Sequence, residues 1–66
     1  MRPLTLKEIV LNTITERLSN RISSDQLERK LHTLKRDYGV MEVLRTFTDV
    51  LAENYKGVTL GKLMGL

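Results

Sequence analysis

Hydrophobic residues recur every three or four positions along three stretches of the chain, and this spacing predicts three helices. The first is expected at about residues 6–19, where Thr5 and Glu8 fit a capping box. At about 100° per residue, its apolar positions cover more than half of the helix circumference; these are Leu6, Ile9, Val10, Leu11, Ile14 and Leu18. One neighbouring helix cannot cover so wide a face, so we expect this helix to be central or shared with a second chain.

The second helix is expected at about residues 24–37, begun by a Ser23–Gln26 capping box and ended by Gly39. Its apolar residues form a narrow seam of Leu27, Leu31, Leu34 and Tyr38. The opposite side and the flanks of the seam carry Arg29, Thr33, Arg36, Lys30 and Lys35. This pattern predicts a peripheral helix with a basic outer face.

The third helix is expected at about residues 40–55 and has no Ser, Thr, Asp or Asn cap, so Gly39 must begin it. Its broad apolar face consists of Val40, Val43, Leu44, Phe47, Val50, Leu51 and Tyr55. The opposite face is acidic and carries Glu42, Thr46, Asp49 and Glu53. We expect this helix to supply most of the core, with Val40 touching Leu34 across the junction.

Five of the nine residues in the C-terminal segment 58–66 are apolar. Such a segment gains free energy when it is covered, at about 25 cal/mol per Å² of apolar surface. It is expected to fold back over the end of the bundle or to contact a second chain. The pattern as a whole predicts an all-α, small three-helix bundle that forms a single helical domain over residues 1–66.

The composition is that of a globular chain, because 41% of the 66 residues are hydrophobic and 29% are charged. There is no cysteine and one histidine, so disulfides, thiolate zinc sites and multi-histidine metal sites are excluded. No apolar run approaches the roughly 20 residues that span a bilayer. We therefore expect a cytoplasmic protein without a membrane segment, a cofactor or a bound metal. A core this small also favours self-association, with a homodimer as the expected form.

No motif for a nucleophile, a phosphate loop or a metal-ligand cluster is present. Glu8 is explained as the partner of Thr5 in the capping box, and His32 as a solvated surface residue. The acidic residues of the third helix are explained as a solvated face. The chain is therefore not expected to be an enzyme or to bind a small-molecule substrate.

The apolar surplus favours a small non-catalytic regulatory module that binds a protein partner and associates with itself. The residues expected to contact a protein partner are Leu11, Leu60, Leu63, Met64 and Leu66.

The alternative is an anionic partner, since the formal net charge is +3. The candidate contacts are Arg17, Arg21, Gln26, Arg29, Lys30, Thr33, Lys35 and Arg36. Residues 22–31 resemble the recognition helix of bacterial winged-helix repressors. The resemblance implies a DNA-binding helix-turn-helix, with Gln26 and Arg29 at base edges and Arg36 at a phosphate. The chain departs from that family because the turn before this helix lacks glycine and no strand pair exists to form a wing.

Overall fold

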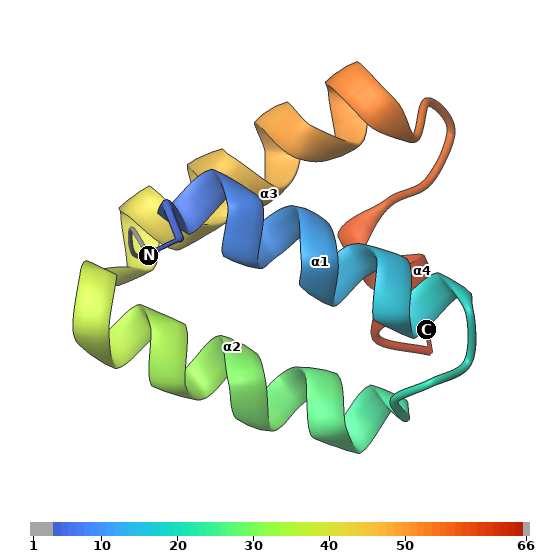
Figure 1. Ribbon diagram of the computed structural model, residues 1–66, viewed down its shortest axis with the longest axis horizontal. Coiled ribbons are helices and arrows are strands. Elements are labelled where there is room, and N and C mark those ends of the chain that lie inside the picture. Colours follow the sequence, from blue (N-terminus) through green and yellow to red (C-terminus); the bar gives the residue numbers. More distant parts are fainter. Residues whose placement is uncertain (1–3, 66) are drawn as a thin grey trace.

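The computed structural model describes residues 4–65, which form four helices and no strand. These are α1 (Leu6–Leu18), α2 (Ser24–Tyr38), α3 (Val40–Asn54) and the single-turn α4 (Leu60–Leu63). Helices α1 and α2 both pack against α3, and α4 packs against α1 (Figure 1). The predicted three-helix bundle is confirmed. Each of the three main helices begins and ends within one residue of its predicted position.

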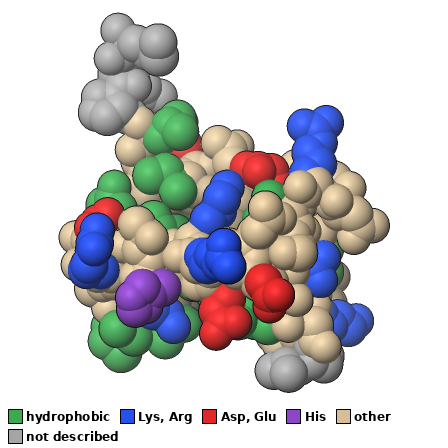
Figure 2. All heavy atoms as spheres, turned by 90° about the horizontal axis from the view of Figure 1, so that it is seen from below, with side chains coloured by type: hydrophobic (Ala, Val, Ile, Leu, Met, Phe, Trp, Pro, Cys, Tyr) green, Lys and Arg blue, Asp and Glu red, His purple; other side chains and the backbone are tan. Residues whose placement is uncertain are grey.

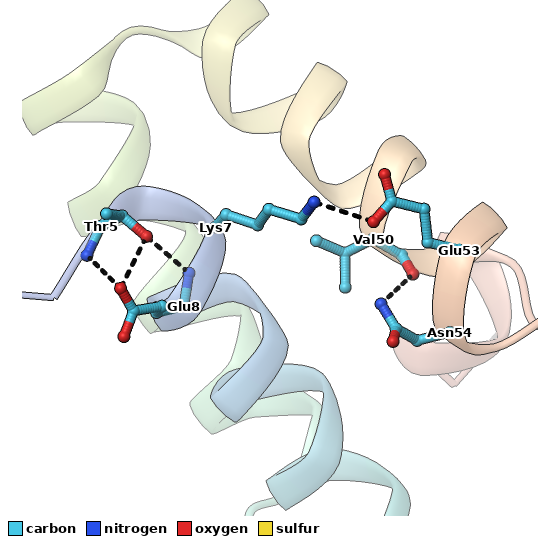
Figure 3. A network of polar contacts seen from close by, with 6 residues as sticks. All are labelled: Thr5, Lys7, Glu8, Val50, Glu53 and Asn54. Atoms are coloured by element: carbon cyan, nitrogen blue, oxygen red, sulfur yellow. Dashed lines mark hydrogen bonds and ion pairs between the residues drawn. The ribbon is translucent and has the colours of Figure 1, made fainter.

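Local hydrogen bonds explain where the helices begin. The Glu8 amide donates to Thr5 Oγ1 at 3.2 Å, and the Thr5 amide donates to Glu8 Oε1 at 3.4 Å (Figure 3). The second capping box pairs the Ser23 amide with Gln26 Oε1 at 2.8 Å and the Gln26 amide with Ser23 Oγ at 3.2 Å. Both predicted capping boxes are therefore present, and each satisfies backbone donors that the helix itself leaves without partners.

Gly39 alone connects α2 to α3. Its φ of 93° and ψ of 144° lie in a region that is open chiefly to glycine, and its amide donates to the Lys35 carbonyl at 2.9 Å. The chain reverses so tightly here that the first turn of α3 lies at the edge of the bundle. The prediction that Val40 belongs to the core face is therefore wrong, because 51% of Val40 is exposed.

The core forms where the three main helices and the C-terminal segment converge. Phe47 of α3 is 1% exposed, and Val10 and Ile14 of α1 are fully buried. Leu6, Ile9 and Leu11 pack against this core from its margin. Helices α2, α3 and α4 all contact α1, so the broad apolar face of α1 is partly covered within one chain, while 43% of Leu18 stays exposed.

Candidate functional site

The C-terminal segment packs against its own chain. Leu63 is 1% exposed and belongs to the core, while Leu60 and Met64 are half-buried at its margin. Arg17 Nε donates to the Leu63 carbonyl at 2.8 Å, which ties this segment to α1. The Leu63 side chain, proposed from the sequence as a partner contact, is therefore occupied inside the molecule, and Leu11 is likewise partly buried. The fifth candidate of this set, Leu66, lies outside the described residues.

Five of the eight candidate contacts for an anionic partner already have partners within the chain, and Arg36, which pairs with Asp37, is one of them. Arg17 binds the Leu63 carbonyl, and Gln26 completes the capping box of α2. Lys30 Nζ lies 3.6 Å from Glu16 Oε1, and the Thr33 hydroxyl donates to the Arg29 carbonyl at 3.2 Å. The sequence could not reveal the Arg17 bond, because its partner is 46 residues further along the chain.

Arg36 and the three remaining candidates do not form a uniformly basic surface. Arg21, Arg29 and Arg36 are exposed and Lys35 is half-buried. Arg36 Nε lies 3.6 Å from Asp37 Oδ1, and α2 also carries Asp25 and Glu28. Figure 2 shows the resulting mixture of blue basic and red acidic side chains on one face of the molecule.

A shallow depression of about 820 Å³ lies along α2. Both charge signs line it, including Glu28, Lys35 and His32, and Met64 reaches its edge. No group of three His, Cys, Asp or Glu side chains within residues 4–65 is arranged to hold a metal ion.

Three large apolar side chains within four consecutive residues are exposed at the α2–α3 junction. Tyr38 is 45%, Val40 51% and Met41 73% exposed, and we call these three residues the apolar corner. Sequence reasoning assigned Tyr38 and Val40 to core faces and gave Met41 no role. The helical positions were right, but the spacing of apolar residues does not show how far a neighbouring helix extends to cover them.

An ion pair joins α1 to α3 across the other side of the bundle. Lys7 Nζ lies 2.8 Å from Glu53 Oε2 (Figure 3). The hydrogen bond to Glu53 and the charge of that carboxylate raise the pKa of Lys7, with a smaller contribution from Asp49. Part of the acidic face of α3 is therefore engaged within the chain.

Neither protein-family models, nor curated proteins, nor solved structures give a match to this chain. Within residues 4–65, none of the helices combines the length and the apolar composition that crossing a membrane requires.

Proposed function

We propose that this protein is a small non-catalytic module that binds other proteins, including a second copy of itself, through the apolar corner. The observation that supports this function is the exposure of Tyr38, Val40 and Met41 around one junction. Adjoining exposed apolar side chains mark interaction sites, and Tyr and Met are enriched in such interfaces. A regulatory role in the cytoplasm stays a prediction from the sequence.

A second copy is a suitable partner because the residues around the corner carry both charge signs. Arg36 and Asp37 precede the corner, and Glu42 and Arg45 follow it. In a two-fold symmetric pair the same patch meets itself, so a cation of one copy can lie opposite an anion of the other. Three side chains supply much less contact area than the roughly 800 Å² that each partner buries in a stable interface. We therefore expect a weak, concentration-dependent dimer.

Sedimentation equilibrium over a range from about 10 µM to 1 mM tests this proposal, since weak pairs dissociate across such concentrations. The weight-average mass of the parent protein should rise with concentration, and Met41→Ser should keep the mass of a monomer. Leu18→Ser is the matched control, because Leu18 is also exposed but lies outside the corner. A parent that stays monomeric throughout, or a Met41→Ser variant that associates equally well, would contradict the proposal.

Nucleic-acid binding by the outer face of α2 is the alternative function. It is supported by Arg21 and Arg29, which are exposed and have no ion pair among the described residues. The acidic residues on the same helix and the internal bonds of Gln26 and Lys30 weigh against it. Retention on DNA at about 0.2 M salt, lost in Arg29→Ala, would favour this alternative over the protein-binding function.

A further inference from the structure

A furrow of about 350 Å³ lies between α1 and α2, and α3 supplies none of its lining residues. The two ribbons run in opposite directions across Figure 1. The furrow is lined by Ile9 and Thr13 of α1 and by Arg29, Lys30, Thr33 and Leu34 of α2. It is therefore a gap between two helices of one chain, and none of its lining residues belongs to the apolar corner.

The floor of the furrow is apolar. Leu34 belongs to the core and Ile9 packs against its margin, and both residues also line the furrow. Thr13 is 3% exposed, and its hydroxyl donates to the Ile9 carbonyl at 2.8 Å. Because that hydroxyl already donates its hydrogen within α1, the floor offers a ligand little besides hydrocarbon contact.

The two ends of the furrow differ. The Lys30–Glu16 ion pair spans the helices toward the α1–α2 turn. In the other direction Tyr38 follows Leu34 by one helical turn and is largely exposed, so the apolar line continues toward the junction. The α2 residues that line the furrow run from Arg29 to Leu34, and Tyr38 extends this line by one further helical turn, so an occupant can lie lengthwise along this part of α2.

The rim that α2 supplies to the furrow is basic, whereas Glu16 of α1 lies at one end of the furrow. Arg29 is exposed, and no carboxylate among residues 4–65 lies within ion-pair distance of it. Lys30 stands beside it with 45% of its side chain exposed despite its contact with Glu16. A ligand that matches both features needs an apolar stripe for the floor and negative charge along the edge of that stripe.

We propose that the furrow binds an amphipathic helix of a partner protein whose apolar stripe is flanked by Asp or Glu. Such a helix would lie against α1 and α2 together, as a helix of the partner added to the bundle. This is the helix-in-groove mode, in which apolar anchors supply contact area and the charged rim selects the partner. A nucleic acid would use the rim but would leave the apolar floor without a partner.

An NMR titration of the ¹⁵N-labelled protein with two synthetic peptides tests the proposal. Each peptide is a helix of about 18 residues, since shorter helices are marginal in water. Both carry Leu at i, i+3, i+4 and i+7; one has Glu on the flanks of this stripe and its twin has Lys. The Glu peptide should shift the amide signals of Ile9, Thr13 and Leu34 and bind about tenfold or more tightly than the Lys twin, as two opposite-charge contacts at a rim allow.

A charge reversal makes the assignment specific. Arg29→Glu should lower the affinity for the Glu peptide by about tenfold and raise the affinity for the Lys twin, because one attractive contact with the Glu peptide becomes repulsive. Arg45→Glu is the matched control, since Arg45 is also exposed but lies on α3. Its peptide affinities should change far less.

Several outcomes would overturn the proposal. They are failure of the Glu peptide to bind, equal affinity for both peptides, or shifts confined to the apolar corner. Shifts of the furrow amides on raising the protein concentration alone would show that a second copy occupies the furrow. Larger shifts at Arg29 with a single-stranded oligonucleotide than with the Glu peptide would assign the rim to nucleic acid.

Discussion

Apolar side chains are buried at one end of the bundle and exposed at the other. At one end the C-terminal segment buries Leu63 to 1% exposure, and Arg17 holds that segment through the Leu63 carbonyl. At the other end the α2–α3 junction leaves Tyr38, Val40 and Met41 exposed, and no element within residues 4–65 covers them. The covered end stabilises the fold, whereas the uncovered end is the surface we propose for partners. Apolar character alone therefore does not distinguish a core residue from a binding residue in this chain.

The largest expected effect is at the covered end. Leu63→Ala should lower the free energy of unfolding by about 2–5 kcal/mol, because it leaves a cavity where α4 meets the core. Thermal unfolding followed by circular dichroism measures this change. Met41→Ala is the matched variant at the uncovered end and should change stability by less than about 0.5 kcal/mol. Equal losses in the two variants would remove the distinction between the ends.

A second comparison concerns the effect on stability of replacing Gly39 or Gly61 by alanine. Gly39→Ala should cost about 1–3 kcal/mol, although a Cβ there would meet no atom within 4 Å, because φ of 93° strains any residue with a side chain. Gly61→Ala in α4 should instead be neutral or stabilise by up to about 1 kcal/mol, since alanine favours the helix. Its Cβ would make only ordinary contact, 3.7 Å from Thr59 Oγ1. Urea unfolding of both variants checks the prediction, and a stable Gly39→Ala would mean that the junction can adopt another turn.

The smallest expected effect concerns the exposed ion pair between α1 and α3. The pKa of Lys7 is raised above its ordinary value of 10.5, chiefly by the hydrogen bond and charge of Glu53. The stability that this pair contributes is therefore fully present below pH 10.5 and is lost as the pH rises through the higher pKa of the folded state. Glu53→Gln should bring the pKa of Lys7 closer to its ordinary value in an NMR titration. An unchanged Lys7 titration in that variant would show that the pair does not persist in solution.

The parts of the fold that the sequence predicted well depend on residues that are close along the chain. The Thr5–Glu8 and Ser23–Gln26 capping boxes join residues three positions apart. Such local chemistry is readable without knowledge of the tertiary structure.

The candidate site was less predictable because exposure depends on residues far away in sequence. The apolar pattern placed Leu63 on a partner surface and Val40 in the core, and the structure shows the reverse exposures. The charge of Arg17 suggested an anionic ligand, but its observed partner is a backbone carbonyl of the C-terminal segment. Apolar spacing and charge define what a side chain needs, and only the packed chain shows whether that need is met internally.

The single-residue connection at Gly39 has a consequence for the order of folding. Loop closure between α2 and α3 costs little entropy, because almost no chain must be ordered between them. Contacts so close in sequence form early, whereas the C-terminal segment must find α1 across more than 40 residues. We therefore expect α4 to dock last and to detach first in brief openings of the native protein. In native-state hydrogen exchange, the amides of Leu63 and Met64 should exchange through such partial openings, at a lower free energy than the amides of Phe47 and Val50.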